Sequence, residues 1–106
     1  MAITNTTSTL SLRSILDKEN ILTGNNFQEW YRRLRIVLRQ ERKLYVLESL
    51  IPDEPPQGAS KTEKDKWRKH VDDALDVQCI MLSSMSSQLQ KMHEEEDSYK
   101  MLSHLQ

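Results

Sequence analysis

Large apolar side chains recur every three or four positions between residues 26 and 40. At about 100° per residue they fall within an arc of roughly 120° on a helical wheel, which is typical of a helix that packs against other helices. Gly24 lets the chain turn into this helix, and Asn25 or Asn26 can cap its first turn. The apolar stripe consists of Phe27, Trp30, Tyr31, Leu34, Val37 and Leu38.

A second apolar segment follows at residues 42–50, and the pattern leaves open whether it continues the first helix. Residues 52–59 contain three prolines and a glycine, which remove backbone donors and predict a surface loop. Ser60 or Thr62 can then cap a long helix that runs to about residue 83. Its predicted stripe is Trp67, Val71, Ala74, Gln78, Met81, Leu82 and Met85.

The serines between residues 83 and 87 predict the end of the long helix and the cap of a short amphipathic one. Asp97 or Ser98 then opens a last helix with Tyr99, Leu102 and Leu105 on one face. With only two glycines and few alternating β-branched runs, the pattern predicts an all-α fold, a small bundle of about four to five helices. The predicted core is Phe27, Trp30, Tyr31, Leu34, Leu38, Trp67 and Val71.

The organisation expected from this pattern is a disordered leader at residues 1–11 and one helical domain at residues 12–106. The leader is small, polar and without a hydrophobic period. The last apolar pattern is still running at Gln106, so we expect the domain to be truncated at its C-terminus. A chain of 106 residues supports one domain with a small core.

The net charge of −1 hides two patches of opposite sign. Arginines occupy the side of the first helix that faces away from its stripe, and Ile36 lies among them, about 180° from Phe27. Patches of opposite charge favour head-to-tail association, although each alone is also compatible with a solvated helix face, and the arginines could bind RNA phosphates. The candidate assembly or RNA contact surface is Arg32, Arg33, Arg35, Ile36, Arg39, Glu94, Glu95, Glu96 and Asp97.

No catalytic, metal or cofactor site is predicted, and no small-molecule substrate. The histidines His70, His93 and His104 are assigned to separate helices, so no nucleophile has a base beside it. The run from His93 to Asp97 lacks the glycine turns and ligand spacing of a hard-metal loop and is interpreted as a solvated acidic linker.

Cys79 is expected to be an inert thiol in the core. Without an apolar run of membrane-spanning length or a signal peptide, the chain is expected to be cytoplasmic and to have no membrane partner.

Several segments in order resemble the Gag region of plant copia-type LTR retrotransposons. The resemblance covers nearly the whole chain beyond residue 10, with a Leu-Thr-Gly, Phe and Trp cluster as its most specific part. It is carried by residues 12–18, 22–27, 30–38, 45–47, 51–52, 55–56, 70–77, Cys79, 81–82, Met85, 89–91 and 93–94.

The resemblance implies a retroviral-capsid-like helical domain that self-associates into virus-like particles enclosing the RNA of the element. In that family the polyprotein continues into a Cys-x2-Cys-x4-His-x4-Cys zinc knuckle and enzyme regions, which this sequence does not contain. Self-association is therefore the expected function, with the chain itself as partner and RNA as a weak second one. Two alternatives stay open: an RNA-binding or chaperone domain that uses the face from Arg32 to Arg39, and a domesticated host protein that binds cellular proteins.

Overall fold

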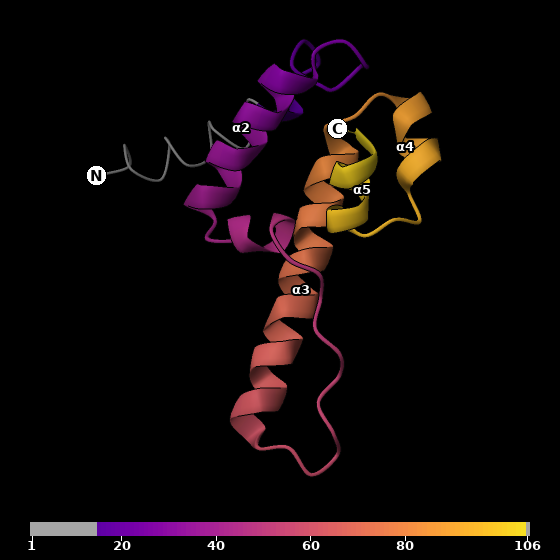
Figure 1. Ribbon diagram of the computed structural model, residues 1–106. Coiled ribbons are helices and arrows are strands. Elements are labelled where there is room, and N and C mark those ends of the chain that lie inside the picture. Colours follow the sequence, from indigo (N-terminus) through magenta and orange to yellow (C-terminus); the bar gives the residue numbers. More distant parts are fainter. Residues whose placement is uncertain (1–14, 106) are drawn as a thin grey trace, which may run out of the picture.

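The computed structural model describes residues 15–105, and every regular element in that part of the chain is helical (Figure 1). No strand occurs among these residues, although Leu22 and Met85 form an isolated parallel β-bridge. The predicted all-α bundle is thus confirmed, while the predicted leader at residues 1–11 lies outside the described part. The elements are α2 (Phe27–Gln40), the 3-10 helix η1 (Leu44–Leu47), α3 (Lys61–Ser83), α4 (Ser87–His93) and α5 (Ser98–Leu105).

Serine side chains begin two of the helices, as the sequence predicts. The Oγ of Ser60 accepts a hydrogen bond of 3.2 Å from the backbone N–H of Glu63, and the Oγ of Ser86 accepts one of 3.4 Å from the N–H of Leu89. Each bond satisfies one of the backbone donors that a helix leaves unpaired in its first turn. The local sequence therefore sets the start of both α3 and α4.

Asn26 precedes α2 but does not cap it with its side chain. Its Oδ1 accepts the backbone N–H of Thr23 at 3.0 Å, and its Nδ2 donates to the carbonyl of Ile21 at 2.8 Å. Gly24, between Thr23 and Asn26, has a φ of +126°, a backbone conformation that favours glycine. Asn26 thus folds the turn in front of the helix instead of closing the first turn of the helix itself.

The two apolar segments at residues 26–50 are separate elements. Arg42, which follows α2, has a left-handed φ of 61°, and its position breaks the helical path. Only Leu44–Leu47 then form a helical turn, shorter than the predicted segment. The break turns Val46 and Leu47 into the core, where α2 packs against η1.

The core draws on all of these elements. Helix α5 packs against α3 and η1, and α3 also contacts α4 and η1. Each fully buried aliphatic side chain contributes about 1.5–3 kcal/mol through removal from water. The largest side chains without exposed surface are Ile15, Leu22, Trp30, Leu34, Leu38, Val46, Val77, Met81 and Met101.

A buried hydrogen bond joins α2 to the end of α3. The indole Nε1 of Trp30 donates to the Oγ of Ser84 at 3.0 Å, and that hydroxyl donates to the carbonyl of Met81 at 2.9 Å. Around the same serine, the carbonyl of Ser84 accepts from Leu22 N–H and the carbonyl of Leu22 accepts from Ser86 N–H, at 2.8 and 2.9 Å. Ser84 therefore joins the end of α3 to α2 through its hydroxyl and to the segment before α2 through its carbonyl.

The predicted placement of Trp67 and Val71 in the core is wrong. Both are half-buried and lie outside the buried cluster. The first half of α3 extends away from the other helices, with the proline-rich segment running beside it (Figure 1). The Nε1 of Trp67 donates to the carbonyl of Pro52 at 2.8 Å. In the first turns of α3, the apolar stripe therefore packs against this loop and not against the core.

The remaining predicted core residues lie on α2, where Trp30, Leu34 and Leu38 are buried and Phe27 and Tyr31 are half-buried against them. Cys79, expected in the core, is exposed. The buried residues of α3 include Val77 and Met81. Cys79 is two positions from each, which is about 200° around a helix, and so it points to the other side.

Replacing Ser84 by alanine should lower the free energy of unfolding by about 1–3 kcal/mol, because the buried indole N–H of Trp30 loses its acceptor. Urea denaturation followed by tryptophan fluorescence measures the change. Ser83→Ala is the matched control, since Ser83 is exposed and should change stability by less than about 0.5 kcal/mol. Equal effects of the two substitutions would contradict the assigned role of the buried hydroxyl.

Candidate functional site

The predicted contact residues of α2 lie on the outer side of that helix. Arg32, Arg35, Ile36 and Arg39 are exposed, whereas Arg33 is half-buried. Ile36 keeps 47% of its surface accessible to solvent, although it is a large apolar residue. It is therefore not part of a second buried stripe, and α2 has one side in the core and one side in solvent.

The arginines of this face differ in what they contact. The guanidinium carbon of Arg35 lies 5.7 Å from the centre of the Tyr31 ring, within cation–π range. Arg32, Arg33 and Arg39 make no ion pair with any residue between positions 15 and 105. Arg32 and Arg39 lie one turn before and almost one turn after Ile36 on the helix, so this apolar side chain is flanked by unpaired charge.

The acidic run from Glu94 to Asp97 divides into two pairs. Glu94 and Glu95 are exposed and form no ion pair within the described residues. The Oδ1 of Asp97 accepts the backbone N–H of Lys100 at 2.9 Å and so helps to begin α5. Glu96 contacts two histidines. Only the first pair is therefore free for a partner, a narrower surface than the sequence predicted.

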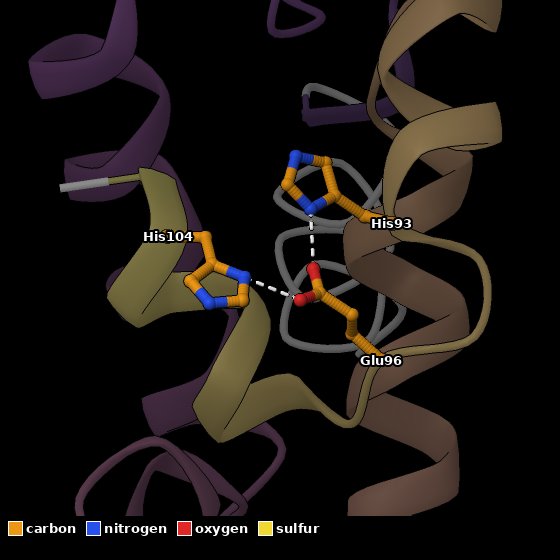
Figure 2. A group of neighbouring side chains, drawn as sticks. All are labelled: His93, Glu96 and His104. Atoms are coloured by element: carbon orange, nitrogen blue, oxygen red, sulfur yellow. Dashed lines mark hydrogen bonds and ion pairs between the residues drawn. The ribbon is translucent and has the colours of Figure 1, made fainter.

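Glu96 lies between His93, at the end of α4, and His104, in the last turn of α5 (Figure 2). The Nδ1 of His93 donates to Oε1 at 2.5 Å, and the Nδ1 of His104 contacts Oε2. His93 is buried and His104 is exposed. The histidines lie on separate helices, as the sequence predicts, yet the packing of α5 brings the ring centres of His93 and His104 to 6.5 Å from each other.

The contacts with both histidines lower the pKa of Glu96 below its usual range. The largest cause is the hydrogen bond from His93, and the charge of His104 acts in the same direction against the effect of burial. The Nε2 of Gln78 on α3 donates to the backbone carbonyl of Glu96 at 2.7 Å, and the N–H of Glu96 donates to the carbonyl of His93 at 2.9 Å. The backbone of Glu96 is therefore fixed by two hydrogen bonds, while its carboxylate is bound by the two imidazole rings.

A second polar cluster joins η1 to α3. The hydroxyl of Tyr45 donates to the carboxylate of Asp73, which also pairs with Lys69 at 2.7 Å. Burial raises the pKa of Tyr45 to about 12, with the hydrogen bond to Asp73 as the next cause. Burial alone would raise the pKa of Asp73, but the hydrogen bonds from Lys69 and Tyr45 outweigh it and lower that pKa. His70 packs edge-on against the Tyr45 ring with the centres 5.0 Å apart.

Sequence patterns could not identify these clusters in full. Tyr45 and Asp73 lie 28 positions apart, and the link from Glu96 to His104 crosses from a turn to another helix. Two spacings were signals, because residues three or four positions apart in a helix share a face: His93 with Glu96, and Lys69 with Asp73. Tyr45, Asp73 and Lys69 are paired with one another, so we assign them to folding, whereas the buried Nε2 of His70 has no hydrogen-bond partner among the described residues.

No protein-family model matches this chain, and neither a curated protein nor a solved structure matches it. Among residues 15–105, no helix has both the length and the apolar character needed to cross a membrane. Of the residues considered above, those open to a partner or ligand are the arginine face of α2, the exposed pair Glu94 and Glu95, and the cluster around Glu96.

Replacing Tyr45 by phenylalanine should lower the free energy of unfolding by about 1 kcal/mol at pH 7, because Asp73 loses one of its hydrogen-bond donors. A pKa raised from 10.0 to about 12 means that this stabilisation is fully present below pH 10 and is lost as the pH rises through about 12. The difference between the two proteins should therefore shrink from pH 7 to pH 11 in urea titrations.

Tyr99→Phe serves as the control, since the Tyr99 side chain is exposed and its hydroxyl makes no hydrogen bond with another described residue. This substitution should leave stability unchanged at both pH values. A stability difference for Tyr45→Phe that stays constant between pH 7 and pH 11 would contradict the assigned pKa.

Proposed function

We propose that this chain is a structural self-association module, the N-terminal capsid part of a copia-type Gag. In this proposal, copies of the chain assemble in the cytoplasm into virus-like particles around the RNA of the element. The observation that carries the proposal is Ile36, exposed on α2 among arginines that have no partner in the described part of the molecule. The all-helical fold and the resemblance of the sequence to the Gag region also support it.

An exposed isoleucine alone is ordinary, because much of any protein surface is apolar. Ile36 differs from an isolated exposed isoleucine because Arg32 and Arg39 lie on either side of it, and an apolar centre with a polar rim is typical of a protein interface. Arginine also loses less hydration than lysine when it is buried against a partner. The face therefore combines a small apolar contact with charges that can select what binds to it.

The pair Glu94 and Glu95 supplies the matching charge on the same chain. Both carboxylates are exposed, and neither has the internal role that Glu96 and Asp97 have. A patch on one copy that binds a different patch on the next copy makes a heterologous contact, which generates rings or open arrays. Repeated weak contacts of this kind are what a closed shell requires. We therefore assign the second copy of this chain as the partner of the arginine face.

The second candidate function is RNA binding by the same arginines. It is favoured by the absence of ion pairs between Arg32, Arg33 or Arg39 and any residue from 15 to 105, since these guanidinium groups could pair with phosphates. It is disfavoured by Ile36 at the centre of the face and by a net charge of −1 for the whole chain. Protein contact is the better fit, and RNA affinity becomes an outcome of the test.

The double variant Arg32→Glu, Arg39→Glu should lose self-association while keeping its helical circular dichroism spectrum, because its reversed face now repels Glu94 and Glu95. Sedimentation velocity over a range of protein concentrations measures the loss. The matched control is Lys61→Glu, Lys66→Glu, which makes the same change in net charge at two exposed positions on the far end of α3. This control should associate like the unchanged chain.

A mixing experiment tests whether the two patches bind each other. The variant Glu94→Lys, Glu95→Lys should also fail to associate alone, but it should associate when it is mixed with Arg32→Glu, Arg39→Glu, since both contacts are then complementary. A mixture that stays monomeric would contradict the head-to-tail pairing. Unchanged assembly of either variant alone would contradict the role of its patch.

The same variants separate assembly from RNA binding. If the arginine face binds RNA, fluorescence anisotropy with single-stranded RNA should show an affinity that falls steeply with salt, with a slope of about 0.7 per phosphate contacted. Arg32→Glu, Arg39→Glu should then reduce both the affinity and the slope. RNA binding of this kind by a chain that remains monomeric would replace the proposed function by the second candidate.

A further inference from the structure

Two imidazole rings converge on one carboxylate at the turn between α4 and α5 (Figure 2). One ligand atom from each of His93, Glu96 and His104 can be chosen so that all three lie within 4.8 Å of one another. We propose that these three residues bind a zinc-class divalent cation. The proposal does not depend on self-association, although His93 and Glu96 flank the exposed pair Glu94 and Glu95 in the sequence.

The donor set determines the kind of cation. Imidazole nitrogen suits zinc and its transition-metal neighbours, whereas magnesium and calcium prefer sites made of oxygen. Two histidines and one glutamate are a ligand set that zinc uses when it keeps a fourth position for water. The exposed side chain of His104 leaves the cluster open to solvent on one side, so an ion and its water can enter. The site therefore fits a three-ligand zinc centre.

The geometry needs little rearrangement. Ligand atoms around a tetrahedral zinc ion lie about 3.4 Å apart, given zinc to ligand distances of about 2.0–2.2 Å. The three atoms now lie within 4.8 Å of one another and must approach that spacing, and the exposed side chain of His104 is free to move inward. In the metal-free arrangement, hydrogen bonds between the rings and the carboxylate already hold the same atoms together.

The backbone fixes two of the ligands before any ion binds. His93 is buried at the end of α4, and the N–H of Glu96 donates to its carbonyl at 2.9 Å. Gln78 holds the carbonyl of Glu96 from α3 at 2.7 Å. A preformed ligand pair of this kind lowers the entropy that binding must overcome. His104 then supplies the third ligand from the last turn of α5.

The protons balance without a further reactant. A neutral histidine carries one proton, and in the metal-free state the proton on Nδ1 bonds to the carboxylate. Coordination through Nδ1 requires that this proton move to Nε2 through solvent, so that the lone pair of Nδ1 faces the ion. The carboxylate is already ionised, and its negative charge offsets part of the charge of the cation.

Binding would join the end of α4, the turn after it and the end of α5. Helix α5 is short, and it places Met101 and Leu102 in the core. An ion that bridges His93 and His104 would restrain both ends of this segment and so stabilise the packing of α5 on α3. Cation binding should therefore stabilise the folded chain, although the fourth position at the ion stays open to water.

The test uses the full chain without a histidine tag, titrated with zinc chloride by calorimetry and with cobalt chloride by visible absorption. We expect one cation per chain, a higher melting temperature with zinc, and the absorption bands of tetrahedral cobalt. His104→Gln and Glu96→Gln should each weaken binding by at least about 10-fold, because each removes a ligand. Glu95→Gln is the matched control, since Glu95 is exposed beside the cluster, and it should bind like the unchanged chain.

Circular dichroism of the metal-free variants shows whether they fold, and NMR of the histidine rings shows which nitrogen binds zinc. Shifts at Nδ1 of His93 and His104 would support the proposal. It would be overturned by the absence of binding at micromolar zinc, or by equal loss in Glu95→Gln, which would mean adventitious binding to the acidic run. Zinc signals confined to His70 would overturn it as well.

Discussion

The hydrogen bond from Trp30 to Ser84 is the constraint on which the rest of the structure depends. The largest apolar residue of α2 carries a polar N–H into the core, where an unpaired donor is costly, so its ring can lie in only one orientation. The acceptor belongs to the residue that ends α3, whose carbonyl also binds Leu22. The positions of α2, the end of α3 and the segment before α2 are therefore fixed together, and the outward direction of the arginine face follows from them.

Much of the fold could be predicted from the sequence because its determinants are local. Ser60 and Ser86 cap helices by bonding to residues three positions later, and the stripe of α2 is periodic. The predictions for Trp67 and Cys79 failed because a periodic pattern cannot say which half of a long helix reaches the core or how its stripe is rotated. The candidate site could be predicted on α2, because the residues outside its apolar stripe are the ones that face solvent. The contact between His93 and His104 was not, since it depends on how α5 folds back. The family resemblance stays a prediction.

The surfaces of this chain are better described by what each charge already contacts than by net charge. Glu94, Glu95, Glu96 and Asp97 are equivalent in sequence, yet two of them act inside the molecule and two face solvent. The same distinction separates Arg35, stacked on Tyr31, from Arg32. A charge engaged internally has already given up part of its hydration and its freedom to move. Only charged side chains without such an internal contact can contribute fully to binding a partner.

The extended half of α3 has a consequence for cooperativity. Its turns rest on a loop through Trp67 and the carbonyl of Pro52, and through Lys64 and the carbonyl of Gln57, with no share in the buried cluster. Secondary structure with few buried apolar contacts opens at a free energy well below that of global unfolding. One continuous helix therefore belongs to two cooperative units, a rigid half that carries the fold and a half that can fray and re-form while the core stays intact.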